Sequence, residues 1–446
     1  MKILKRITLI LASIVAVSSC DVLNVEPSQS IPSEGAITSA NDLERALMGC
    51  YDGLQSSGYY GLDYLIAPEL VSDNLIWTGT SQDYGALDNN VISPDQFLVE
   101  GIWSSIYNVI NRTNNALYYL PGVENLNEAD EKNYTGELKF IRALAYFDLV
   151  KLFGGVPLRE LPSLDAGEDL YIPRSSEEDI YDFIITELIE ADTLISNTHK
   201  GRATQAAAKA LLARAYLYSG DYNNAWDAAN YVIENHSDIY LTEFYDEIFQ
   251  NEFSSESIFE LSFNDEDGNR IAQYFSPRPA GRHEFAPSEE IIGAYHEDDL
   301  RFSASIDITT NEDEPAVAKY TDVQLGSDNV VVLRLAEMYL IRAEAEANKD
   351  NPELNNIIAD INTIRTRANL VDTDATTLDE LKEEILQQRR FELAFDGHRW
   401  FDLIRAGKAL EVLENVTSEN QLLFPIPQSE ILSNDAIKPT DQNPGY

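Results

Sequence analysis

The chain has few basic residues, few methionines and only two cysteines. Its 446 residues contain 32 Lys and Arg against 76 Asp and Glu, which gives a formal net charge of −44. Nucleic-acid binding needs Lys and Arg to displace phosphate counterions, so this composition argues against a nucleic-acid partner. It also argues against electrostatic binding to a bare anionic membrane. The 44% of hydrophobic residues is ordinary for a globular chain and suffices for a large core.

The sequence motifs of common catalytic and cofactor sites are also missing. There is no GxxxxGK(S/T), GxGxxG, HExxH or GxSxG motif, and the five histidines lack the spacing of a metal site. Asp265, Asp267 and Asn269 resemble the start of a calcium loop. The twelfth position is Ser276 rather than Glu, which excludes an EF-hand and leaves an irregular calcium site open. We expect no cofactor, no resident metal and no catalytic centre, although the many carboxylates leave a glycosidase-type pair open.

Residues 1–19 have the pattern of a secretory signal peptide. Three basic residues precede an apolar run from Ile7 to Val17, which is too short to span a bilayer, and small residues follow. VSSC resembles a relaxed lipobox, in which Cys20 is lipidated and becomes the first residue of the mature chain. We therefore expect a membrane anchor on Cys20 and a polar tether over residues 20–38. Cys50 then has no disulfide partner, and its apolar helical surroundings predict a buried free thiol.

Helical periodicity dominates the remaining sequence. It predicts helices over residues 41–55, 103–117 and 176–195, the last with a capping box formed by Ser176 and Asp179. Strands are few: residues 257–263 alternate in strand fashion, and VAKY near Lys319 is a second short candidate. Two stretches, residues 72–94 and 264–287, are predicted as long loops, which are functional in many compact domains.

A weak internal repeat places an Arg-Ala pair among small residues in three helical segments. These segments are residues 141–147, 212–229 and 341–347. The second has Leu, Ala, Tyr, Gly and Ala where a tetratricopeptide unit needs them, with Gly220 and Asp221 at the turn. We prefer this interpretation to a generic helical hairpin. The predicted fold is mainly α: irregular tetratricopeptide-like helix pairs, within about 101–236 and 333–370, form a scaffold with a loop-rich remainder and few short strands.

The stretch QQRRFELAFDGHRWFDLIRAGK, residues 387–408, resembles an active site because it is dense in charge. Spacing of i,i+3 lets Arg389 reach Glu392, and lets Asp402 reach both Arg399 and Arg405. Gly397 suits a left-handed cap. The charges therefore neutralise one another, and we interpret the stretch as a structural latch between the C-terminal tail and the helical scaffold.

Several stretches together resemble the SusD/RagB family over essentially the whole chain. They are IWSSIYNVINRTNNAL, RALAYFDLVKLFGGVPL, LRLAEMYLIRAEA, INTIRTRANL, the charged stretch 387–408 and the tail LFPIPQSEILSNDAIKPTDQNPGY, together with the lipobox. The resemblance implies one SusD-like domain over residues 39–446, with the C-terminal motif and tail at 371–446. It further implies a non-catalytic outer-membrane lipoprotein facing the cell exterior. Such a protein binds oligosaccharides and delivers them to a SusC-type TonB-dependent barrel.

Tryptophan positions suggest where a ligand binds. Three of the four lie in scaffold motifs (Trp103, Trp226 and Trp400), where we expect them in the core, whereas Trp77 lies in the first predicted loop. An aromatic ring covers the apolar face of a sugar while neighbouring polar groups bind its hydroxyls. The resemblance places glycan contacts in loops of these two regions without matching single residues. The predicted glycan-binding residues are Asp73, Asn74, Trp77, Gln82, Tyr84, Tyr274, Arg282 and His283.

Alternatives remain open at this point. Trp77 could instead anchor its own loop, and most of the 23 tyrosines suit a core as well as a binding surface. The arginines of the second loop also suit a uronic acid or a sulfate. RagB-like relatives are thought to bind peptides, so a peptide ligand is an alternative, as is a tetratricopeptide-type scaffold that binds only proteins.

Overall fold

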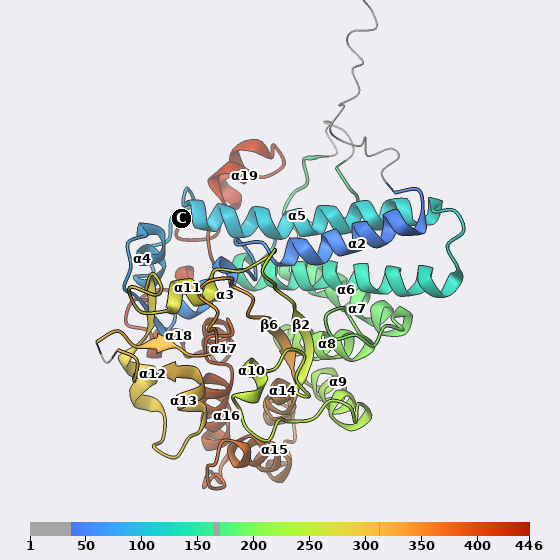
Figure 1. Cartoon of the computed structure of the whole chain (residues 1–446). Helices are drawn as coiled ribbons and strands as arrows, with labels where there is room; N and C mark the ends of the chain where they lie inside the picture. The colour runs from blue at the N-terminus through green and yellow to red at the C-terminus, as the bar shows by residue number, and fades with distance from the viewer. Residues whose placement is uncertain (1–36, 164–169, 312) are drawn as a thin grey trace, which may run out of the picture.

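The computed structural model describes residues 37–163, 170–311 and 313–446, and helices make up most of it (Figure 1). The predicted signal peptide, Cys20 and most of the predicted tether lie outside these residues. Across the described ranges, no helix is both long and apolar enough to cross a bilayer. The architecture confirms the predicted class, a helical scaffold with a loop-rich remainder and few short strands.

The scaffold is a series of helices, each packed against the next. Its members are α2 (Ala40–Leu54), α5 (Phe97–Tyr119), α6 (Glu128–Phe153), α7 (Glu177–Leu194), α8 (Gln205–Ser219), α9 (Tyr222–Asn235), α14 (Leu335–Ala347), α15 (Leu354–Arg367) and α16 (Leu378–Glu392). In Figure 1, α2, α5 and α6 run side by side, and α7, α8 and α9 follow below them. Helix α14 packs against α9 although residues 236–334 separate them in sequence. This insertion explains why the predicted repeats are unevenly spaced.

Local sequence signals account for several of these helices. Ser176 and Asp179 form the predicted capping box at the start of α7. Gly220 adopts the left-handed conformation with φ of +80°, and the side chain of Asp221 caps α9, which confirms the predicted hairpin. A Cβ atom at Gly136 would lie 2.7 Å from the Ile195 side chain, so only glycine lets α6 approach the end of α7 this closely.

The loop-rich remainder consists of short elements. They are α3 (Asp63–Leu70), β1 (Leu75–Trp77), α4 (Gln82–Asp88), η1 (Leu120–Gly122), α10 (Glu247–Gln250), β2 (Ser257–Leu261), α11 (Ile271–Phe275), β3 (Phe285–Pro287), α12 (Glu289–Ala294), α13 (Arg301–Ser305), β4 (Ile306–Asp307), β5 (Ala316–Val317) and β6 (Val330–Arg334). After α16 come α17 (Arg399–Arg405), α18 (Ala409–Val412), η3 (Glu419–Gln421), α19 (Gln428–Ser433) and η4 (Pro439–Asp441).

The strands form antiparallel pairs: β1 with β3, β2 with β6 and β4 with β5. The predicted strand at 257–263 is confirmed as β2, whereas of the second candidate, VAKY, only Val317 lies in a strand, β5. The prediction of two continuous loops is wrong, because residues 72–94 contain β1 and α4 and residues 264–287 contain α11 and β3. A three-residue strand leaves little local signal, and β1 is held by a partner far away in the chain.

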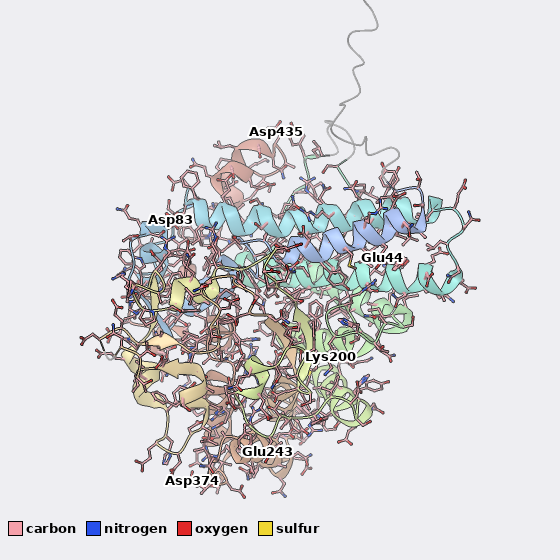
Figure 2. All side chains as sticks on the ribbon, viewed as in Figure 1. Glu44, Asp83, Lys200, Glu243, Asp374 and Asp435 are labelled. Atoms are coloured by element: carbon pink, nitrogen blue, oxygen red, sulfur yellow. The ribbon has the colours of Figure 1, made fainter. Side chains whose placement is uncertain are left out.

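One continuous apolar core runs from Leu43 in α2 to Ile426 in the tail. Cys50 is buried in it, as predicted, and burial raises the pKa of its thiol to about 12. Trp103 and Trp400 are buried, and Trp226 is half-buried against the same core. Many carboxylates, among them Glu243, Asp374 and Asp435, lie exposed on the surface (Figure 2). The outer bounds of the single domain, residues 39 and 446, stay a prediction.

Candidate functional site

Pairing of β1 with β3 brings the two predicted ligand loops together. Trp77 lies opposite Phe285 in the register of this pair. The ring of Tyr84, from α4, meets Phe285 edge-on at 4.7 Å and Tyr274, from α11, at 6.3 Å between centroids. We call residues 78–82 and 274–284 the β1–β3 edge. Six of the eight predicted ligand residues therefore lie in or beside one place, although the two loops are far apart in sequence.

Two of these six side chains present polar groups to solvent. The guanidinium of Arg282 lies over the Tyr274 ring at 4.6 Å, and its Nη1 donates to the Tyr274 hydroxyl at 3.0 Å. The Arg282 side chain is 44% exposed. Gln82, the first residue of α4, is also exposed. An exposed guanidinium over an aromatic ring, together with an exposed amide in the 78–82 segment of the same edge, can bind the hydroxyls or the carboxylate of a sugar.

A buried carboxylate fixes the turn that leads to Gln82. Glu284 accepts hydrogen bonds from the backbone N–H groups of Thr80 and Ser81, both at 2.7 Å. Gly79 packs against the same carboxyl group so closely that a Cβ atom there would lie 2.1 Å from its carbon. Only glycine permits this approach, so the turn and the exposed Gln82 are held in place by Glu284.

Trp77 differs from the exposed platform that the sequence suggested. It ends a strand rather than lying in a loop, and it is half-buried against the core. A Cβ atom at Gly85 would lie 2.8 Å from the indole ring, so the ring rests directly on α4. Trp77 therefore anchors its own segment, and only the remainder of the ring is open to a ligand.

Tyr84, Tyr274 and His283 are buried at the β1–β3 edge. The Tyr84 hydroxyl donates to Asp63 at 2.6 Å, and the ring nitrogen of His283 contacts the Pro315 carbonyl oxygen at 3.1 Å. Burial raises the pKa of Asp63 to about 6, against a lowering effect of the Tyr84 hydrogen bond. The contacts of these side chains are therefore mainly with the protein itself, and their predicted role in ligand binding stays a prediction.

Asp73 and Asn74 belong to a different cluster. Asp73 forms ion pairs with Arg390 at 2.9 Å and with Arg399 at 2.7 Å. Asn74 is fully buried and donates to Glu69 at 2.8 Å while accepting from Arg390 at 3.0 Å. Their hydrogen-bonding groups are engaged by the charged stretch 387–408, so the prediction that these two residues face a ligand does not fit their surroundings.

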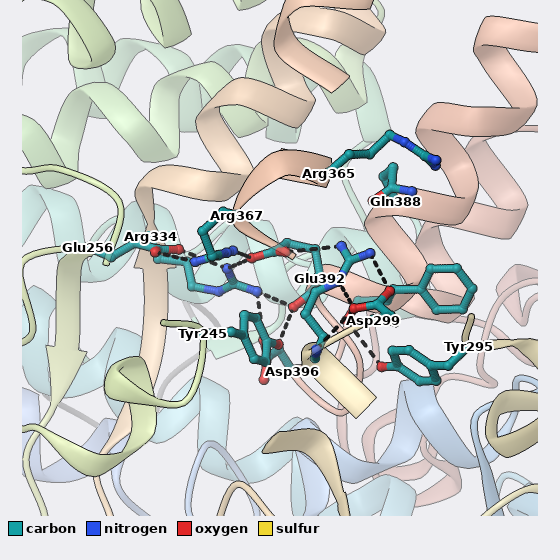
Figure 3. Close-up of polar contacts among 12 residues, drawn as sticks. Tyr245, Glu256, Tyr295, Asp299, Arg334, Arg365, Arg367, Gln388, Glu392 and Asp396 are labelled. Atoms are coloured by element: carbon teal, nitrogen blue, oxygen red, sulfur yellow. Dashed lines mark hydrogen bonds and ion pairs between the residues drawn. The ribbon is translucent and has the colours of Figure 1, made fainter. Parts of the chain in front are cut away.

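The charged stretch is centred on a buried carboxylate. Glu392 accepts from three arginines, Arg301, Arg334 and Arg367, and all four side chains are almost completely buried (Figure 3). Burial by itself raises the pKa of a carboxyl group, but here the three guanidinium groups outweigh burial and hold the pKa of Glu392 far below its usual range. The cluster is charge-compensated and closed to solvent, as a structural core of ion pairs must be.

The ion-pair partners within this stretch differ from the predicted ones. Arg389 pairs with Asp402 at 2.8 Å instead of Glu392, and Arg399 pairs with Asp73 instead of Asp402. The pair Arg405–Asp402 is confirmed at 2.9 Å. Gly397 is left-handed, with φ of +79°, but α16 already ends at Glu392. Short helices turn these side chains toward other elements, so i,i+3 spacing along one helix does not decide the partners.

The role of a latch to the C-terminal tail also needs correction. The tail bonds to the end of α6, where the Phe424 N–H donates to the Leu152 carbonyl at 2.8 Å. The charged stretch instead bonds α3 through Glu69, whose carboxylate accepts from the backbone N–H groups of Gly397 and His398. It ties the C-terminal motif to the segment that leads into β1.

Metal chemistry finds no support within the described residues. They contain no group of three or more His, Cys, Asp or Glu side chains suited to hold a metal ion. Asn264 instead closes a turn, its carbonyl and side-chain oxygens accepting the backbone N–H of Asp267 at 3.2 and 3.1 Å.

A second hollow, whose lining resembles that of a ligand site, was not predicted from the sequence. A hollow of about 840 Å³ lies beside α10 and α13, and the exposed ring of Phe244 lines it. The sequence feature that could have indicated this hollow is the spacing of Phe244 and Phe249 among Asp and Glu residues. That pattern equally suits a short amphipathic helix, so only the structure distinguishes the two.

Comparison with known proteins identifies the family. The model of the SusD family matches residues 308–417, and the model described as "Starch-binding associating with outer membrane" matches residues 21–217. Both halves of the chain are thus matched independently, and the resemblance seen in the sequence is confirmed. The chain belongs to the SusD/RagB family.

Individual relatives match over nearly their full length. A SusD-like protein of Formosa agariphila is 26% identical, over 96% of this chain and 97% of that protein. A solved laminarin-binding SusD-like protein has a TM-score of 0.81 at 26% identity, covering 92% of this chain and 100% of its own. The surface glycan-binding protein A from Bacteroides fluxus has a TM-score of 0.79 at 26% identity, with 92% and 100% coverage.

Proposed function

We propose that this protein is a non-catalytic glycan-binding lipoprotein of the outer membrane. It is anchored through Cys20, faces the cell exterior and delivers oligosaccharides to a SusC-type TonB-dependent transporter. Membership of the SusD/RagB family and similarity to a laminarin-binding protein and to a surface glycan-binding protein support this proposal. The negative net charge of −44 disfavours nucleic acid as the ligand.

The observation that carries the proposal is the arrangement of Arg282 at the β1–β3 edge. Its side chain is 44% exposed, its guanidinium lies over the Tyr274 ring at 4.6 Å and it pairs with Glu284 at 3.5 Å. Glu284 also fixes the turn that presents Gln82. Trp77 contributes the open part of its ring, and the buried Tyr84 and His283 position the edge. Such a site combines one flat face with several hydrogen-bonding groups, as sugar recognition requires.

Isothermal titration calorimetry with laminarin, starch and polygalacturonate tests this site on the soluble chain. We expect Arg282→Ala to weaken binding of the recognised glycan about tenfold, because a charged hydrogen-bonding group is lost. Arg45→Ala serves as the matched control, since Arg45 is a 77% exposed arginine of α2. Equal affinity of the Arg282→Ala variant and the wild type for every polymer would remove the β1–β3 edge from the binding site.

The polymer that binds also decides the ligand class. Polygalacturonate preferred over both neutral glucans would mean that Arg282 pairs with uronate carboxylates. Binding of laminarin or starch without polygalacturonate would mean that it binds sugar hydroxyls instead.

A further inference from the structure

The hollow beside α10 and α13 has the size of a ligand pocket. Its volume of about 840 Å³ falls within the range of roughly 300–1,000 Å³ that small-molecule sites occupy. The side chains that the argument uses are Phe244, Phe249, Gln250, Ser303, Thr321 and Asp328. Phe244 precedes α10, Phe249 and Gln250 lie in α10, Ser303 lies in α13, and Thr321 and Asp328 lie between β5 and β6 (Figure 1).

Aromatic rings form one wall of this hollow. Phe244 is 51% exposed, although a large apolar side chain normally gains free energy from burial. Phe249 is half-buried, with the Lys319 ammonium 4.5 Å from its ring centroid and the Tyr245 ring 5.5 Å away. One fixed ring and one exposed ring thus line the same space, which suits the apolar C–H face of a pyranose.

The polar lining is rich in hydroxyl, amide and carboxylate groups. Ser303 and Thr321 contribute hydroxyls, and Gln250 contributes an exposed amide held at 2.8 Å on the Asp246 carboxylate. The cation at the wall, Lys319, is neutralised by Asp396 at 2.8 Å. Asp246, Glu247 and Asp328 therefore leave the lining with net negative charge. Such a lining accepts hydrogen bonds from sugar hydroxyls and disfavours uronates and sulfates.

The buried ion-pair cluster holds the floor of the hollow rigid. The Tyr245 hydroxyl donates to the backbone carbonyl of Glu392 at 2.6 Å. Asp396 holds Lys319 and lies beside Glu392 in the same cluster (Figure 3). A preformed wall lowers the entropy that a ligand loses on binding, so a small ligand can bind without rearrangement.

We propose that this hollow is a second carbohydrate site, which binds one or two rings of a neutral saccharide between Phe244 and the polar groups of Gln250, Ser303 and Thr321. It is separate from the β1–β3 edge, shares none of its residues and differs from it in charge. The site holds a short saccharide whether or not the β1–β3 edge binds a polymer.

Saturation-transfer NMR and calorimetry with maltotriose, laminaritriose and trigalacturonate test the proposal. We expect the wild type to bind at least one of the two neutral trisaccharides, and Phe244→Ala to weaken that binding about tenfold through loss of the stacking face. Phe97→Ala is the matched control, because Phe97 is an 83% exposed phenylalanine at the start of α5. Its affinity should equal that of the wild type.

The double variant Gln82→Ala/Arg282→Ala separates this proposal from the proposed function. Trisaccharide binding that persists in the double variant and is lost in Phe244→Ala supports the second site, even if polymer binding fails. Two results would overturn it: equal trisaccharide affinity of Phe244→Ala and wild type, or binding of trigalacturonate in preference to both neutral sugars. Absence of any trisaccharide binding by the wild type would overturn it as well.

Discussion

The charged stretch 387–408 and the β1–β3 edge are both rich in arginine and carboxylate, yet they differ in exposure. Arg389 is 1% exposed and bonded to Asp402, whereas Arg282 is 44% exposed and stacked on a tyrosine ring. In the first region the buried arginines pair with buried or nearly buried carboxylates, which gives a rigid support. In the second, Arg282 pairs with the buried Glu284 at 3.5 Å, but its side chain stays partly open to solvent. Exposure of a fixed charge, rather than the density of charges, therefore marks the better candidate for ligand binding.

Two carboxyl groups, Asp63 and Glu392, also differ in how strongly nearby cations compensate their charge. Burial raises the pKa of Asp63, beside the β1–β3 edge, to about 6, and the opposing effects of the Tyr84 hydrogen bond and of Arg270 are smaller. Glu392 is buried at least as deeply, but three arginines hold its pKa far below the usual range. The first carboxylate destabilises the folded chain when it ionises, and the second stabilises it.

Removing the central carboxylate should have the largest effect. Glu392→Gln leaves Arg301, Arg334 and Arg367 without their common anion, and breaking a buried pair of this kind costs about 3–5 kcal/mol of the free energy of unfolding. Chemical denaturation measures this cost. Glu411→Gln is the control, because Glu411 is 69% exposed in its ion pair and should change stability by less than about 1 kcal/mol. Similar losses for both variants would contradict the contrast between buried and exposed charge.

The next largest effect is expected at the contact between the charged stretch and the segment that leads into β1. Arg399→Ala removes the pair with Asp73 at 2.7 Å and should lower the free energy of unfolding by about 2–3 kcal/mol. Glycan affinity of the folded fraction should stay unchanged, as measured by calorimetry beside Arg45→Ala. Loss of affinity at unchanged stability would assign Arg399 to ligand binding instead of support.

The smallest effect concerns pH. Because the folded chain holds the proton of Asp63 more tightly than the unfolded chain, its contribution to the free energy of unfolding falls as pH rises from about 4 to about 6, and is constant above. Between about pH 4 and about pH 7, the stability of Asp63→Asn relative to the wild type should therefore increase by about 2 kcal/mol. Denaturation at both pH values measures the gain, with the exposed Asp374→Asn as baseline. A difference that is the same at both pH values would exclude the raised pKa.

Local signals in the sequence predicted much of the scaffold. The capping box of Ser176 and Asp179 and the glycine turn at Gly220 each act within a few residues, so the sequence alone reveals them. The burial of Cys50 and Trp103 followed from their apolar helical surroundings, and that of Trp400 from its place in the C-terminal motif. The family was recognisable for the same reason, since its motifs are contiguous stretches.

The candidate site was only partly predictable. The sequence predicted both loop regions, but it missed β1 and β3, which exist because they pair with each other across the chain. Asp73 and Asn74 were predicted to bind a ligand. Local sequence could not reveal their structural partners, Arg390 and Arg399, because these lie more than three hundred residues away in the chain. Phe244 and Gln250 gave no signal distinct from that of a packing helix.

The helical class and the family could be read from the sequence alone, because periodicity, caps and contiguous motifs are short-range properties. Only the tertiary structure decided which charges are buried and which stay open, because ion-pair partners and exposure depend on contacts between distant segments. This difference in burial separates Glu392, a structural carboxylate, from Arg282, an exposed cation at the candidate site.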